Sequence, residues 1–224
     1  MSVDYINGKV SGYSFDDETP YEAEAVYYLN FQITSALSSL DHLTTLCNDG
    51  FVWENKYEYY HYYSDHLMFS IGQIANRFVP SGKDNQEKKE RKKRNRNSFQ
   101  FTQEQFPILS DKRARNVIEH IDERDTLVIQ KHNGVGGFNV IDDDVEDELA
   151  TFLLNNKETH IYTLDLESEE LLIRDKDEDL VVNFEKLRAE LLSLQENVNW
   201  LRDMIRKANV FLDTSSLPEG VTIR

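Results

Sequence analysis

Arginine, asparagine and histidine side chains cluster in residues 110–125, which read SDKRARNVIEHIDERD. Within this segment Arg115, Asn116 and His120 combine two kinds of chemistry. An imidazole titrates near neutral pH and can give or take a proton. A guanidinium group suits the negative charge that spreads over a phosphate during displacement. Together these residue types could let an RNA 2′-hydroxyl attack its own phosphate without a metal ion.

A helix over residues 110–125 would have one apolar and one polar face. At 100° per residue, the apolar side chains gather on the side that must face a core: Ala114, Val117, Ile118 and Ile121. Arg113, Asn116 and His120 lie on the opposite face, with Arg115 on the flank. In a two-fold dimer this polar face could meet its own copy and form one shared cleft. In a monomer it would be a solvated face, on which Arg115 and Glu119 could form an ordinary surface pair.

The segment RNVIEH resembles the signature of HEPN ribonucleases, in which arginine is followed by a polar residue and, after four to six intervening residues, by histidine. Arg115, Asn116 and His120 match it with four intervening residues. Arg113 fits the six-residue spacing, but Ala114 follows it, so Arg115 is preferred. The resemblance implies a site formed across a homodimer, with His120 as acid or base and Arg115 on the scissile phosphate. Asn116 would position a neighbouring group or the substrate, and Arg113 would help to bind it.

The resemblance also implies a function. It predicts a metal-independent endoribonuclease that needs no cofactor, used in a toxin–antitoxin or phage-defence system. RNA would be the substrate, and an antitoxin or another protein is a possible partner.

Four main helices are expected to position the motif. The first is indicated by Thr19 as N-cap, Pro20 at the first helical position and Glu22 three residues after the cap. Apolar spacing predicts core helices over roughly 19–48, 52–79, 110–125 and 180–208. Short β-branched runs predict a β-rich insert over roughly 126–179. We therefore expect one mainly α domain over 1–224, an up-and-down four-helix bundle of HEPN type with a small β-rich insertion before the last long helix.

Residues 81–98 contain a strongly basic run, KKERKKRNR, and no large apolar residue. We expect an exposed loop, or a fraying extension of the preceding helix. Its side chains could bind phosphate and guide RNA towards the cleft; the candidates are Lys92, Lys93, Arg94 and Arg96. The alternative is a solvated loop with no ligand.

The segment YEYYHYYSDH, residues 57–66, is rich in tyrosine. His61 and Asp65, four residues apart, could share a metal ion or brace the active site, and the rings could stack on bases. Neighbouring tyrosines must also cover several faces of a helix, which favours a bundle or dimer face. No further clear metal ligand accompanies the pair, so no metal site is predicted.

The composition limits the classes of partner. The net charge of −16 means that any nucleic-acid contact would have to be local. Acidic runs around the β-rich insert offer a second function: a non-catalytic HEPN-fold protein that binds a basic partner. A nucleotide-binding helical module is a further alternative.

The single cysteine, Cys47, excludes an internal disulfide framework. No apolar run is long enough for a membrane helix and no secretion signal is apparent, so a cytoplasmic setting is expected.

Overall fold

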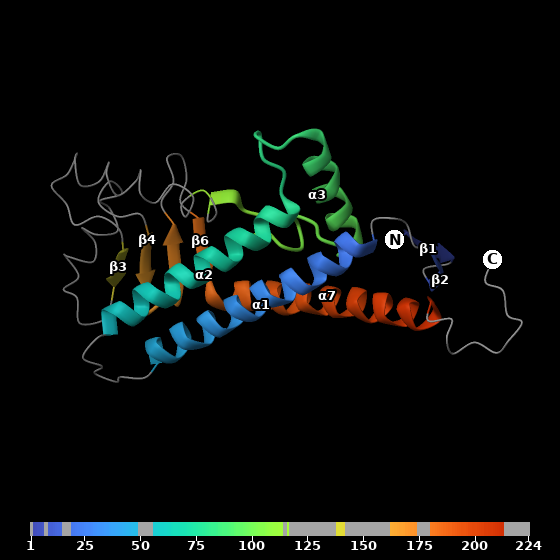
Figure 1. Ribbon diagram of the computed structural model, residues 1–224. Helices are drawn as coiled ribbons and strands as arrows, with labels where there is room; N and C mark the ends of the chain where they lie inside the picture. Colours follow the sequence, from blue (N-terminus) through green and yellow to red (C-terminus); the bar gives the residue numbers. More distant parts are fainter. Residues whose placement is uncertain are drawn as a thin grey trace, which may run out of the picture.

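The computed structural model describes residues 2–6, 9–14, 19–48, 56–113, 116, 138–141, 162–173 and 180–212. Within these residues the fold is mainly helical (Figure 1). The long helices are α1 (Thr19–Asn48), α2 (Lys56–Phe78) and α7 (Phe184–Leu212), and a shorter helix, α3, spans Gln86–Ser98. Helix α1 packs against both α2 and α7. The mainly helical prediction is therefore confirmed, while the four-helix bundle of HEPN type stays a prediction.

Helices α1 and α2 form as the sequence predicts. Thr19 and Pro20 begin α1, and Glu22 lies in its first turn. A stripe of fully buried residues then follows at three- and four-residue spacing: Leu29, Ile33, Ala36, Leu40 and Leu43. Two polar contacts join the helices, Tyr28 Oη donating to Gln73 Oε1 at 2.7 Å and Ser70 Oγ to Ser35 Oγ at 3.0 Å. Apolar burial sets which faces meet, and these bonds add to their alignment.

Helix α3 occupies most of the basic segment 81–98. The prediction of an exposed loop is wrong for residues 86–98, and the alternative, an extension of the preceding helix, does not form either because non-helical residues 79–85 separate α2 from α3. Asn85 caps the helix by accepting a hydrogen bond from Lys88 N at 2.9 Å. Side-chain pairs one turn apart, Gln86 with Glu90 and Glu87 with Arg91, add local support. The helix needs no apolar stripe because polar tertiary contacts hold it. Its buried residues are Lys92 and Asn95, and Asn95 Nδ2 donates to Arg77 O at 3.1 Å.

The chain after α3 folds back over the end of α2 through an aromatic layer. The Phe78 and Phe101 rings stack at 4.0 Å between centroids, and Phe101 stacks on Phe106 at 4.7 Å. Phe99 is fully buried, and its carbonyl accepts from Asn197 Nδ2 at 2.9 Å. This layer fixes residues 99–109 against both α2 and α7.

A small sheet precedes the last helix, as predicted. Strands β4 (Tyr162–Asp165), β5 (Glu170–Ile173) and β6 (Leu180–Asn183) pair antiparallel in sequence order, and β3 (Phe138–Ile141) adds to β4 in parallel. Its buried residues, among them Leu164, Leu171 and Val182, join the helical core.

The start of the last helix was predicted wrongly. Residues 180–183 form β6, and α7 begins only at Phe184. Leu180 and Val182 are buried while Val181 is exposed, which is the two-residue period of a strand. Asn183 then caps α7 by accepting from Lys186 N at 3.1 Å. The amphipathic pattern of α7 itself is as expected, with Leu187, Leu191, Leu194, Val198 and Leu201 buried.

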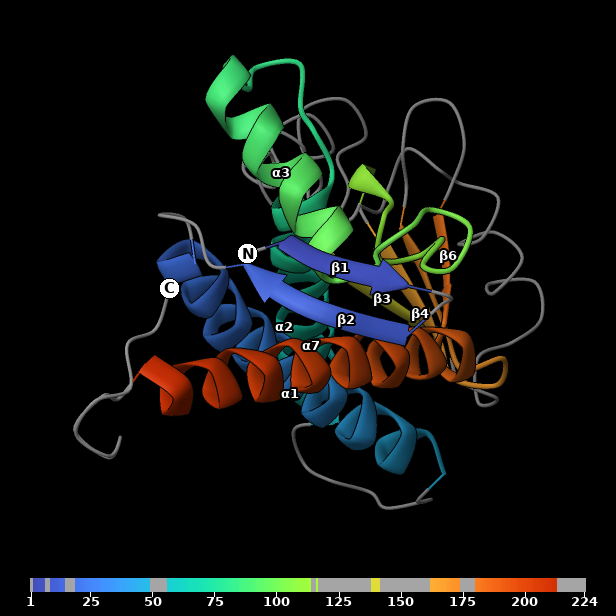
Figure 2. The ribbon, with the colours of Figure 1, turned by 90° about the vertical axis from the view of Figure 1, so that its right-hand side faces the viewer.

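An antiparallel hairpin of β1 (Ser2–Ile6) and β2 (Lys9–Ser14) was not expected (Figure 2). The predicted helix over 110–125 is described only at its start, where residues 112, 113 and 116 are helical. The remainder of that helix lies outside the described residues, as does the first part of the predicted β-rich insert, residues 126–137. Among the described helices, none is both long and apolar enough to cross a membrane.

Candidate functional site

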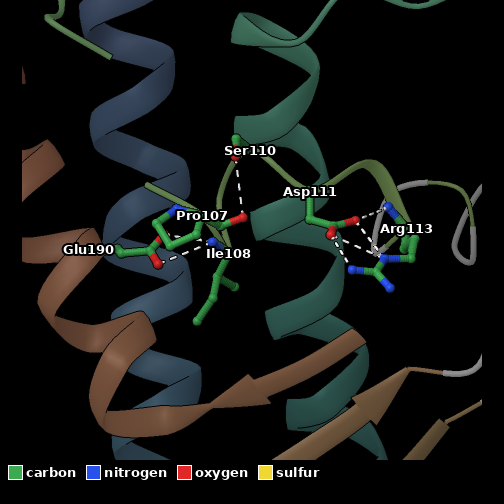
Figure 3. A network of polar contacts seen from close by, with 6 residues as sticks. All are labelled: Pro107, Ile108, Ser110, Asp111, Arg113 and Glu190. Carbon is green, nitrogen blue, oxygen red and sulfur yellow. Dashed lines mark hydrogen bonds and ion pairs between the residues drawn. The ribbon is translucent and has the colours of Figure 1, made fainter. Parts of the chain in front are cut away.

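The turn that leads into the candidate motif is held by a buried carboxylate from α7. Glu190, 8% exposed, accepts from Ile108 N through both oxygens at 3.1 Å (Figure 3). It also accepts from Leu109 N at 2.9 Å. Burial raises the pKa of the Glu190 carboxyl, and the hydrogen bonds from Leu109 and Ile108 oppose that rise. Glu190 was not singled out from the sequence, because its partners are more than eighty residues away.

Asp111 begins the helix that follows this turn. Its Oδ1 accepts from Arg113 N at 2.8 Å, the contact expected of an N-cap residue. The same carboxylate binds the Arg113 guanidinium, with Nη2 at 2.6 Å from Oδ2 (Figure 3). The helix therefore starts where the sequence predicted. The guanidinium group of Arg113, a candidate for substrate binding, is bound in this structure to Asp111, the residue that caps its helix.

The predicted catalytic residues are described only in part. Asn116 is helical and exposed. Arg115 and His120 lie outside the described residues, so the structure does not test whether the three side chains converge. The described geometry fixes the start of the motif helix and leaves one of its candidate residues facing solvent.

The basic side chains of the predicted phosphate-binding run divide between surface and interior. Lys93 is exposed, and Arg94 and Arg96 are half-buried. Lys92 is buried, and its Nζ lies 2.9 Å from Asp84 Oδ2 while donating to Val79 O at 3.0 Å and Asn76 Oδ1 at 3.2 Å. The expectation that Lys92 lies on an exposed loop is therefore wrong: its ammonium group joins α3 to the end of α2. Other basic residues of α3 are exposed, namely Lys88, Lys89 and Arg91.

We expect Lys92→Met to destabilise the protein by about 2–3 kcal/mol, because the change leaves a mostly buried carboxylate without its cation. A hydrogen bond from Ser81 N and another from Lys92 hold the pKa of Asp84 below its ordinary value. Urea unfolding at neutral pH measures the loss. Lys93→Met, the same change at the exposed neighbour, should cost less than about 0.5 kcal/mol. Equal losses in the two variants would contradict the structural role of Lys92.

The tyrosine-rich segment covers several faces of α2, as expected. Tyr60 is fully buried and donates to Leu46 O at 3.1 Å, whereas Tyr59 and Tyr62 are 38% and 54% exposed. His61 Nε2 lies 3.4 Å from Asp65 Oδ2. Within the described residues no group of three or more histidine, cysteine or acidic side chains could hold a metal ion.

Comparisons of the chain with protein-family models, with curated proteins and with solved structures give no match.

Proposed function

We propose that the chain is a metal-independent endoribonuclease of HEPN type, acting as a homodimer in a toxin–antitoxin or phage-defence role. The observation that carries the proposal is the start of the motif helix. Asp111 caps it, Glu190 anchors the turn before it, and Asn116 is exposed on it. A catalytic helix needs a rigid base that holds its side chains in productive geometry.

The spacing of the motif supports a shared polar face. If the helix that begins at Lys112 continues for two more turns, Asn116 and His120 lie one above the other, with Arg115 beside them. His120 would take the proton from the RNA 2′-hydroxyl or give one to the leaving oxygen. Arg115 would stabilise the charge on the phosphate. The 2′-oxygen forms a bond to phosphorus, the bond to the 5′-oxygen breaks, and the products are a 2′,3′-cyclic phosphate and a 5′-hydroxyl end.

The basic surface of α3 supports an RNA substrate. Phosphate binding needs a local concentration of cations in a chain whose net charge is −16. Helix α3 supplies such a concentration of cations through four exposed residues: Lys88, Lys89, Arg91 and Lys93. The segment that follows α3 leads directly through the aromatic layer to the motif helix, so both belong to one continuous part of the fold.

RNA cleavage in the presence of EDTA tests the proposal. The purified protein should cut RNA and leave 2′,3′-cyclic phosphate ends, detected as ends that resist alkaline phosphatase until acid opens the cyclic phosphate. If every RNA stays intact while the protein forms a stable complex with a basic protein, the proposal fails. The acidic, non-catalytic binding protein then becomes the better interpretation.

A further inference from the structure

Helix α1 carries two large aromatic side chains on its outer surface. Tyr27 is 79% exposed and Phe31, one turn later, is 62% exposed. Residues four apart lie on one face of a helix, so the two rings form a continuous patch, which we call the α1 aromatic stripe. Exposed aromatic residues that gather in this way mark interaction surfaces.

The packing of α1 explains why the stripe faces outward. One flank of the helix is bonded to α2, through Tyr28 and Gln73, and the other approaches α7, where Arg188 Nη1 donates to Asp41 Oδ1 at 2.6 Å. The core-facing side carries Leu29 and Ile33, both fully buried. These contacts lie on other sides of α1 and leave the Tyr27 and Phe31 rings exposed on its outer surface.

A groove lies beside the stripe, between α1 and α7. Its volume is about 330 Å³. Its lining residues come from both helices: Ala23, Val26, Tyr27 and Asn30 from α1, and Arg202, Ile205 and Arg206 from α7. Val26 and Ile205 are buried and give the groove an apolar floor, while the two arginines line its α7 side.

The charges on the two features are complementary. Glu24 precedes Tyr27 and Phe31 by three and seven residues, so it lies on the same face of α1. Its side chain is 63% exposed, with one oxygen 3.5 Å from Arg77 Nη2. The stripe is thus apolar with a carboxylate beside it, and the groove is apolar with guanidinium groups beside it.

We propose that this surface binds a second copy of the chain across a two-fold axis. A two-fold interface uses the same patch on both subunits and therefore requires a self-complementary surface. Here the Tyr27 and Phe31 rings of each copy enter the groove of the other, and Glu24 meets Arg206 of the facing α7. Both halves of the contact are present on one chain. The inference rests on the proposed function in one respect, the homodimer, for which it names a contact surface; none of the motif residues belongs to that surface.

Sedimentation velocity over a range of protein concentrations tests the surface. The wild-type chain should sediment as a dimer, with about twice its mass of 26.2 kDa. Phe31→Glu should weaken self-association at least about 30-fold, because it places a charge at the centre of an apolar contact. Phe69→Glu makes the same change at an aromatic residue of α2 that is 45% exposed and outside the stripe and groove. This control should leave the dimer unchanged, and circular dichroism should report the same helix content in both variants.

A charge exchange gives a second, more specific readout. Glu24→Arg and Arg206→Glu should each weaken the homodimer, because they place like charges opposite one another. An equimolar mixture of the two variants should form a mixed dimer.

A monomeric wild type at about 100 μM, a range in which interfaces of micromolar affinity are dimeric, would overturn the inference. So would a Phe31→Glu variant that dimerises as well as Phe69→Glu. A dimer that Phe31→Glu disrupts but that cuts no RNA would support this surface while contradicting the proposed function. RNA cleavage by a dimer that Phe31→Glu leaves intact would do the reverse, so the two failures can be told apart.

Discussion

His120→Ala is expected to reduce RNA cleavage by about 10²- to 10⁴-fold, the range that general acid–base catalysis contributes. The imidazole is the group in the motif that can exchange a proton near neutral pH. Arg115→Ala should cost about 10²- to 10³-fold, since it removes charge stabilisation from the phosphate. Single-turnover cleavage of a labelled RNA measures both losses, and urea unfolding shows whether the variants stay folded.

His66→Ala provides the matched control for the histidine change. His66 is exposed on α2, where its ring lies 4.3 Å from that of Tyr62, and it is not part of the motif. The control should cleave RNA at the wild-type rate. If His66→Ala and His120→Ala lose activity equally, the effect is not specific to the motif and His120 is not its acid or base.

Glu190→Ala is expected to lower the free energy of unfolding by about 2–4 kcal/mol, because it leaves two buried backbone N–H groups without an acceptor. These groups belong to Ile108 and Leu109, directly before the helix cap at Asp111. Urea unfolding measures the loss. Glu196→Ala, at an exposed position of the same helix, should change stability by less than about 0.5 kcal/mol. Similar losses in both variants would mean that Glu190 does not anchor the turn.

The raised pKa of Glu190 gives the same site a pH dependence. A folded-state pKa above the unfolded value means that the native state holds this proton more tightly. The resulting stability is fully present below the unfolded pKa and is lost as the pH rises through the folded one. Wild type should therefore lose stability relative to Glu190→Gln as the pH rises through this window. Unfolding of both proteins between roughly pH 4 and pH 8 covers it. Parallel stability curves would contradict the assignment.

The sequence predicted those helices and strands that are marked by local signals or by periodic apolar residues. Thr19 and Pro20 located the start of α1, and the apolar spacing over 110–125 located the start of the motif helix, which Asp111 caps. The short β-branched runs predicted a sheet before α7. The β1–β2 hairpin was missed although Asn7-Gly8 stands between its two strands, a dipeptide typical of tight hairpin turns.

Other features depend on contacts between residues far apart in sequence. Helix α3 lacks an apolar stripe and is held by Lys92 and Asn95, so its charge pattern alone resembled a loop. Its cap at Asn85 and the Glu87–Arg91 pair were local signals that could have indicated it. Glu190 occupies a polar position of an amphipathic helix, and the sequence gives no sign that this carboxylate is buried. The formation of α3 and the burial of Glu190 were both determined by contacts with residues far away in the sequence.

The junction between β6 and α7 sets the rotational phase of the last helix. No residue separates Asn183 from Phe184, and the Asn183 side chain bonds both to Lys186 N and, at 3.2 Å, to Glu170 of β5. Each residue inserted here would turn the rest of α7 by 100° and advance it by 1.5 Å. Glu190, only seven residues on, would then face away from Ile108 and Leu109. The sheet therefore sets the orientation of α7 about its own axis. Through this orientation, strands β5 and β6 determine whether Glu190 faces Ile108 and Leu109, although they are distant in sequence from that turn.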